Sequence, residues 1–147
     1  MSPIEVILLA GSVCGVLDLL SATALVKLRG GNFRQLLQFV ASGALGATAF
    51  KRGNQSAAAG FLFHFLIAFT AATTYFATSR ALPILVTHAI LCGMLYGALI
   101  HLFMTFLIIP LSRVPKRKFS ASAFLSQLAV HMFVVGLSIS LIVSHFS

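Results

Sequence analysis

Residues 4–28 read IEVILLAGSVCGVLDLLSATALVKL, an apolar run that is long enough to cross a bilayer as one helix. At about 1.5 Å of rise per residue, about 20 such residues cover the roughly 30 Å of hydrocarbon in a membrane. Three further runs of this kind follow, at about 56–78, 84–111 and 121–145. Because the four runs take up most of the chain, we expect a single transmembrane domain over residues 1–147.

The composition agrees with this interpretation. Hydrophobic residues make up 59% of the chain and charged residues 8%, and the mean hydropathy is +1.04. A water-soluble domain of this length does not bury so large a share of apolar side chains. The predicted fold class is therefore all-α and integral to a membrane, an antiparallel bundle of four transmembrane helices.

The segment at about 32–50 is apolar but too short to span a membrane comfortably. Its apolar residues recur at helical spacing on one face, and its polar residues, among them Gln38 and Ser42, recur on the opposite face. This pattern predicts a short interfacial helix between the first two spans. A re-entrant segment is the alternative, because Gly43 and Gly46 weaken the far end of the helix.

The positive charges are distributed unevenly along the chain. Of ten Lys and Arg residues, nine flank the first and third connections between the predicted spans, and only Arg80 lies in the second. Since positive residues gather on the cytoplasmic side, we expect both termini and the Arg80 turn on the non-cytoplasmic side.

A basic, membrane-facing group of residues fills the third connection: Arg113, Lys116, Arg117 and Lys118. Orientation in the membrane explains this group, and binding of anionic lipid headgroups is the alternative. The basic residues of the chain do not form one face with interleaved aromatic side chains, so we expect no nucleic-acid partner.

Small residues recur at spacings that let helices approach closely. Gly11 and Gly15 share one face of the first predicted helix, and Gly93 and Gly97 share one face of the third. Gly60 lies on the face of the second helix that also carries His64. We expect these glycines to face other helices rather than lipid.

Each predicted span carries one ionisable residue at a similar depth. Counted from the basic residues at the boundary, these four residues lie about 13 to 20 Å into the membrane. They are Asp18, His64, His101 and His131. A charged carboxylate in hydrocarbon is costly unless it is protonated or paired. We therefore expect the four side chains to converge inside the bundle, with a histidine within hydrogen-bond reach of Asp18.

This polar layer leaves several functions open. The four side chains could only hydrogen-bond helix to helix, or they could relay protons in a small transporter. Carboxylate and imidazole ligands also suit a transition metal such as zinc, iron or copper, which Asp18 and the histidines would hold. Two of the three histidines, His64, His101 and His131, could instead be the axial ligands of a haem.

No sequence motif of an enzyme accompanies this layer. The sequence lacks H-E-x-x-H, C-x-x-C, G-x-S-x-G and phosphate-binding glycine loops. We expect a non-enzymatic protein that is an accessory or interaction subunit of a membrane complex, with lipid and either other membrane subunits or further copies of the chain as partners. A small transporter or proton-linked carrier is the alternative, and a haem- or metal-binding redox subunit is a further one.

Four short motifs give the chain a resemblance to a known group of proteins. They are G-x-x-x-G-x-x-D at 11–18, H-F-L-I-A at 64–68, C-G-M-L-Y-G at 92–97 and I-I-P-L-S at 108–112. With these motifs most of the chain resembles small four-helix bacterial inner-membrane proteins of unknown function. The resemblance implies a location in the bacterial cytoplasmic membrane and supplies no functional residue.

Overall fold

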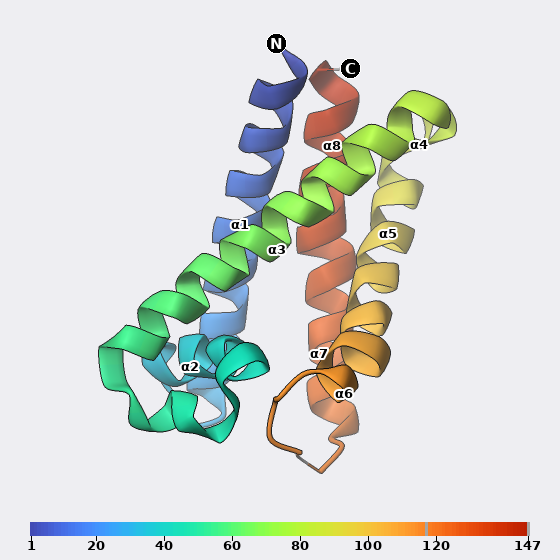
Figure 1. Ribbon diagram of the computed structural model, residues 1–147. Coiled ribbons are helices and arrows are strands. Elements are labelled where there is room, and N and C mark those ends of the chain that lie inside the picture. The colour runs from blue at the N-terminus through green and yellow to red at the C-terminus, as the bar shows by residue number, and fades with distance from the viewer. Residues whose placement is uncertain (117, 147) are drawn as a thin grey trace.

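The computed structural model describes residues 1–116 and 118–146. Of the described residues 88% are helical and none lies in a strand, so the all-α prediction is confirmed. Figure 1 shows the elements, which are α1 Pro3–Leu28, α2 Phe33–Leu45, η1 Gly46–Lys51, α3 Gly53–Ala81, α4 Ile84–Thr87, α5 Ala89–Phe103, η2 Met104–Ile108, α6 Ile109–Leu111, α7 Ala121–Val130, η3 His131–Gly136 and α8 Leu137–Phe146. η1 is a 3₁₀ helix, whereas η2 and η3 are π-helical turns that continue α5 and α7.

Four helical segments of the described chain are long and apolar enough to cross a membrane, as predicted. They are Pro3–Leu28, Gly53–Ala81, Ala89–Leu111 and Ala121–Phe146. The second exceeds the predicted 56–78, because Gly53, with a φ of 56°, turns the chain from η1 directly into α3. The third begins later than the predicted 84–111, because α4 forms a separate turn that ends at the non-helical His88.

Figure 1 shows how the chain runs between two ends of the molecule. Both termini and α4 lie at one end, and α2 and α6 lie at the other. α3 crosses the molecule at a slant and packs against α1 and α2, whereas α5 packs against η3 and α8. On the side of α4, α3 and α5 contact each other, and the Tyr96 hydroxyl donates a 2.8 Å hydrogen bond to the carbonyl oxygen of Ala71. Away from α4 the two helices diverge.

α2 differs from its prediction in which side chains face the protein. Gln38 and Ser42, expected on an outer polar face, are 4% and 0% exposed. They are buried because α2 packs on the start of α3, where the Gln38 side-chain amide donates to the Gly53 carbonyl oxygen at 3.1 Å. The predicted polar face is therefore wrong at these two positions, where hydrogen bonds to backbone carbonyls replace contact with water. The predicted helix at 32–50 is divided, because Gly46, with a φ of 64°, ends α2.

Glycines bring α5 and η3 into contact through their backbones. A Cβ added to Gly97 would overlap the carbonyl oxygen of His131, and one added to Gly136 would overlap that of Gly93. Gly93 and Gly97 were identified from their G-x-x-x-G spacing, whereas Gly136 was not, because its helix has no second glycine. The close approach of the third and fourth spans thus depends on one glycine that the analysis of G-x-x-x-G pairs did not select.

The other predicted glycines also lie inside the fold, against different partners. A Cβ on Gly11 or Gly15 would meet an aromatic ring of α3, that of Phe69 or Phe65. One on Gly60 would overlap the carbonyl oxygen of Leu37 in α2. Gly60 therefore serves the contact between α2 and α3, although it shares a helix face with His64.

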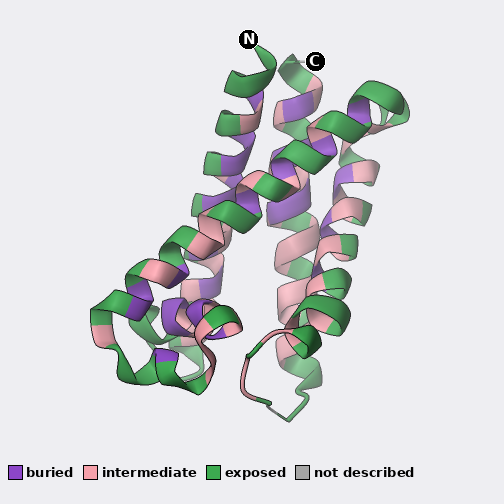
Figure 2. Cartoon of the chain, in the orientation of Figure 1, coloured by how far each residue is buried: buried purple, intermediate pink, exposed green. Residues whose placement is uncertain are grey.

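The main hydrophobic core lies in the half of the molecule that holds the termini, where Figure 2 shows buried residues on helix faces turned toward one another. Its buried members are Val6, Ala10, Cys14, Ala72, Tyr75, Val135, Ile139 and Val143. A smaller cluster of Leu19, Leu37 and Ala57 joins α1, α2 and α3. The outward faces of the helices are largely exposed and apolar.

Candidate functional site

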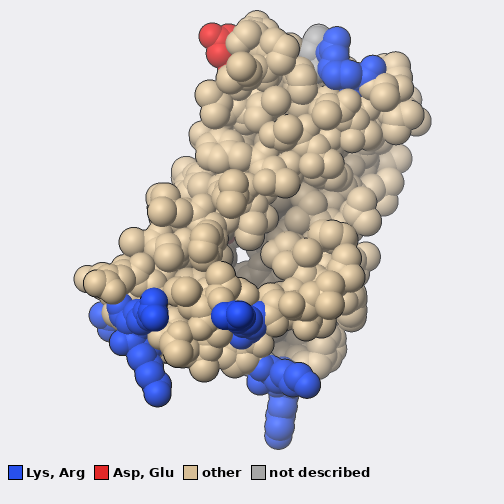
Figure 3. Space-filling view, in the orientation of Figure 1, with Lys and Arg blue, Asp and Glu red and all other residues tan. Residues whose placement is uncertain are grey.

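A cavity of about 210 Å³ lies where α3 diverges from α5. Gly43, Ser112 and Val114 line it at the end of the molecule that holds α2 and α6. Asp18, His64 and His131 line it deeper, toward the core. Figure 3 shows the surface hollowed on this face, close to the positively charged side chains of that end. The volume has room for several water molecules, which the polar groups would bind.

Asp18 and His64 face each other across the contact between α1 and α3. Asp18 Oδ2 and His64 Nδ1 are 4.0 Å apart, which is an ion-pair separation and exceeds a direct hydrogen bond. The other ring nitrogen of His64, Nε2, bonds the carbonyl oxygen of Gly15 at 2.8 Å. Because a carbonyl oxygen only accepts, Nε2 carries a hydrogen and Nδ1 is the atom that gains or loses a proton. The α1–α3 contact thereby turns the titratable nitrogen of His64 toward Asp18.

The surroundings of this pair disfavour an isolated charge. The side chains of His64 and Asp18 are 12% and 20% exposed, so neither charge is fully hydrated. A lone carboxylate or imidazolium is costly in such surroundings, whereas a protonated carboxyl beside neutral imidazole, or a carboxylate beside imidazolium, is not. In both arrangements the pair carries no net charge, and the cavity that both side chains line has room for water beside it.

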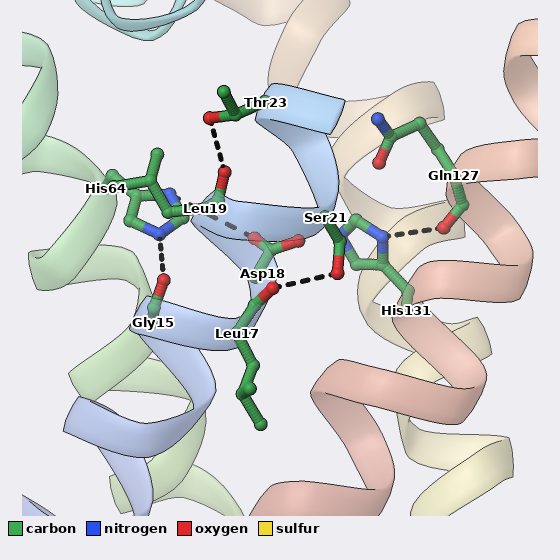
Figure 4. A network of polar contacts seen from close by, with 9 residues as sticks. All are labelled: Gly15, Leu17, Asp18, Leu19, Ser21, Thr23, His64, Gln127 and His131. Atoms are coloured by element: carbon green, nitrogen blue, oxygen red, sulfur yellow. Dashed lines mark hydrogen bonds and ion pairs between the residues drawn. The ribbon is translucent and has the colours of Figure 1, made fainter. Parts of the chain in front are cut away.

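His131 enters the same cavity from η3. Its Nδ1 donates a 2.8 Å hydrogen bond to the carbonyl oxygen of Gln127, one turn earlier, which leaves Nε2 to exchange protons. In Figure 4, His64 and His131 lie on opposite sides of Asp18. His131 is also the first residue of the π-helical turn, an irregularity that recurs at functional sites.

His101 lies apart from the cavity lining, behind His131. The two rings pack together with centroids 5.0 Å apart, and the ring of Phe124 covers His101 at 4.8 Å. His101 is 6% exposed. Among the buried side-chain nitrogen and oxygen atoms of the described residues, only His101 Nε2 has no hydrogen-bond partner. The expected layer thus separates into an Asp18–His64 pair and a His101–His131 pair, and three of its four members share the cavity.

This arrangement bears on the cofactors considered from sequence. In the described part of the chain, no three His, Cys, Asp or Glu side chains come close enough together to hold a metal ion. A haem iron between His101 and His131 would require these two rings, which are in contact, to separate. The chemistry that the present geometry supports directly is proton exchange between Asp18, the cavity histidines and water.

The other acidic residue of the chain lies far from the Asp18 carboxyl. The chain has two acidic residues, and the second, Glu5, lies in the first turn of α1. Figure 3 shows acidic atoms on the surface at the end with the termini, whereas the positive side chains gather mainly at the opposite end, toward which the cavity extends. Asp18 is therefore the single carboxyl available to this site.

The predicted basic group lies beside the cavity. Arg113, Lys116 and Lys118 reach the surface, whereas Arg117 lies outside the described residues. The Arg113 amide donates a 3.0 Å hydrogen bond to the carbonyl oxygen of Gly43, which attaches this segment to α2. This bond joins two stretches of the cavity lining that are far apart in sequence.

Several cavity residues were not identified from sequence, among them Cys14, Phe39 and Ser112. No role was assigned to them from the sequence, because their place at the cavity comes from the slant of α3, which leaves space beside them. Comparisons of the chain with protein-family models, with curated protein sequences and with solved structures gave no match.

Proposed function

We propose that this chain is a small proton-linked carrier of the bacterial inner membrane, in which Asp18 and His64 bind and release a proton that enters from the basic end. The observation that carries this proposal is the placement of both side chains on one cavity, with the titratable nitrogen of His64 facing the carboxyl of Asp18. Ionisable groups inside membrane-spanning helices commonly mark proton or ion pathways.

Membrane insertion is supported by the outward side chains of the four spans. In their apolar windows, between 11% and 39% of residues are buried inside the protein. Large apolar side chains such as Leu62 and Leu95 are 68% and 60% exposed. Leaving so much apolar surface in water is unfavourable, so lipid is the solvent that fits it.

The orientation in this proposal follows from the positive charges. Figure 3 shows most of them at the end away from the termini, and the basic end would face the cytoplasm. The four spans would then cross in antiparallel order, with both termini outside. An impermeant thiol reagent on intact cells should label a cysteine at Arg80→Cys but not one at Lys116→Cys, both without Cys14 and Cys92. The reverse pattern would show the opposite orientation.

Infrared spectroscopy of the reconstituted protein tests the shared proton. The protonated-carboxyl stretch should titrate with pH, disappear in Asp18→Asn, and shift in His64→Gln, whose amide can keep the bond to Gly15 but takes up no proton. Glu5→Gln, which removes the exposed acid, is the matched control and should leave the Asp18 band in place. An Asp18 band that is insensitive to His64→Gln would show that the two groups share no proton.

Vesicles with a trapped pH-sensitive dye test transport itself. A potential that drives protons inward should acidify vesicles with the unmodified protein, and Asp18→Asn should reduce the rate to that of protein-free vesicles. His88→Gln, at an exposed histidine outside the cavity, is the control and should retain the flux. Equal rates for the unmodified protein and Asp18→Asn would contradict passage of protons alone through this site.

An accessory or interaction subunit is the second candidate. The glycine faces that first suggested it are used within the chain, since Gly11, Gly15, Gly60, Gly93 and Gly97 all contact its own helices. A different feature favours it, a row of exposed large apolar side chains along α5 and η2: Leu91, Leu95, Leu99, Leu102 and Phe106. Their spacing of three and four residues suits contact with another membrane helix.

Cross-linking separates this candidate from a lone carrier. A cysteine at Leu95→Cys should form a cross-link in native membranes if a neighbouring helix covers α5, and one at Leu8→Cys on α1 serves as control. Copurification of one protein in fixed proportion, or a cross-linked second copy, would favour the interaction role. A monomer that carries protons would exclude any need for a partner.

A further inference from the structure

A second concave site lies between α2 and the start of α3, apart from the Asp18 cavity. It is a groove of about 510 Å³. Phe33, Phe61 and Leu62 form its walls, and Leu37 and Ala57 form its floor. Arg34 and Asn54, its polar lining residues, lie at the start of the two helices. The groove is thus almost wholly apolar, with Arg34 and Asn54 as the polar residues of its lining.

The floor of this groove is rigid. At Gly60 the backbones of α2 and α3 meet so closely that a Cβ would overlap the carbonyl oxygen of Leu37. The Gln38 side chain adds a 3.1 Å hydrogen bond to the Gly53 carbonyl oxygen. Because these contacts fix how the two helices lie, the groove is a built feature of the fold rather than a gap between mobile parts.

The positive charges near this groove favour an anionic ligand. Arg34 lines the groove, and Lys51 and Arg52 directly precede α3 at the same end of the molecule. Figure 3 shows positive side chains gathered over this corner. The two acids of the chain are elsewhere, since Glu5 is at the terminal end and Asp18 lines the cavity. The Arg34 guanidinium and the Asn54 amide can both donate hydrogen bonds to phosphate oxygens.

The length of the apolar walls favours a ligand that has a long apolar part as well as a charged group. Asn54 and Leu62 are eight residues apart on α3, which is about 12 Å at about 1.5 Å per residue. Phe61 and Leu62 are 42% and 68% exposed, so an apolar chain can lie along them. A free inorganic anion would leave this apolar length uncovered.

We propose that the groove binds one anionic phospholipid, with its phosphate at Arg34 and an acyl chain along Phe61 and Leu62. The site differs from the basic segment at Arg113, because it combines charge with an apolar slot. The inference rests on the membrane insertion within the proposed function but not on proton exchange at Asp18.

The absence of tryptophan from the sequence allows a direct test. Phe61→Trp places a single fluorophore in the groove, and the full-length variant is reconstituted in phosphatidylcholine vesicles that contain brominated-chain lipid. Brominated phosphatidylglycerol should half-quench this fluorophore at about a fivefold lower mole fraction than brominated phosphatidylcholine does, since one basic side chain near a membrane surface favours an anionic lipid by about this factor. Adding Arg34→Gln should remove most of this preference.

Leu125→Trp, on the exposed side of α7 at the same end of the molecule, is the matched control. Its fluorescence should be quenched by both lipids with little preference, which also reports that the protein is inserted. Leu62→Trp is a second groove reporter if Phe61→Trp does not fold.

Each remaining outcome would overturn the proposal. Equal quenching of the Phe61→Trp variant by both lipids would show no selection of the headgroup. An unchanged preference in the variant with Arg34→Gln would show that the headgroup is not held at Arg34. Quenching of the Leu125→Trp variant but not of the groove variant would show that protein, such as a second copy, covers the groove, whereas no quenching of either would contradict membrane insertion.

Discussion

The two halves of this molecule differ in how the third and fourth spans and α3 pack together. In the half with the termini, backbones touch at Gly93 and Gly136, and Ile139 is 0% exposed. In the other half α3 leaves α5, and a cavity of about 210 Å³ reaches Asp18. The contrast indicates different roles for the two halves. The packed half holds the helices in place, and the cavity of the other, hollow half leaves space for water beside the ionisable groups.

The largest effect should come from adding one methyl group where backbones touch. Gly136→Ala would place its Cβ on the carbonyl oxygen of Gly93, and neither helix can move without separating from the core. We expect a loss of about 3 kcal/mol or more in the free energy of unfolding. Chemical unfolding in detergent micelles, followed by circular dichroism, measures this loss.

The same change in the hollow half is the control. A Cβ on Gly43 meets no atom within 4 Å, and Gly43 lies inside α2. Gly43→Ala should therefore stabilise the protein by up to about 1 kcal/mol through helix propensity. Equal losses for the two variants would contradict the contrast between the halves.

An intermediate effect should come from truncating one isoleucine in each half. Ile139→Ala empties a fully buried position in the core and should cost about 2 to 3 kcal/mol, the lower part of the range for such truncations. Ile109 borders the cavity, so Ile109→Ala enlarges an existing space and should cost about 1 kcal/mol. The same unfolding measurement compares them, and a larger loss for Ile109→Ala would show that the hollow half is the one that holds the fold.

The smallest effect on stability should come from the central acid. In Asp18→Asn, His64 can stay neutral and keep its bond to Gly15, so no unpaired charge remains buried. We expect the free energy of unfolding to change by about 1 kcal/mol or less. A loss of several kcal/mol would mean that the Asp18–His64 pair joins α1 to α3, which is the structural role that the sequence left open.

The elements of the site show where sequence reasoning succeeds. The spans near residues 4–28 and 121–145 were predicted almost to their ends, because hydropathy over a helix length is a local property. Asp18 and His131 stood out for a similar reason, since an ionisable residue within an apolar run carries a large burial cost wherever it points.

What the sequence by itself determined is the set of four apolar helices, the asymmetry of charge between their ends and the positions of the ionisable residues along them. Only the tertiary structure decided that α3 slants away from α5, that Gln38 turns inward, that Gly136 completes a glycine contact and that His101 stands behind His131. These features depend on how helices far apart in the sequence cross and interlock. Side-chain volumes on two surfaces set that crossing together, so neither helix encodes it alone.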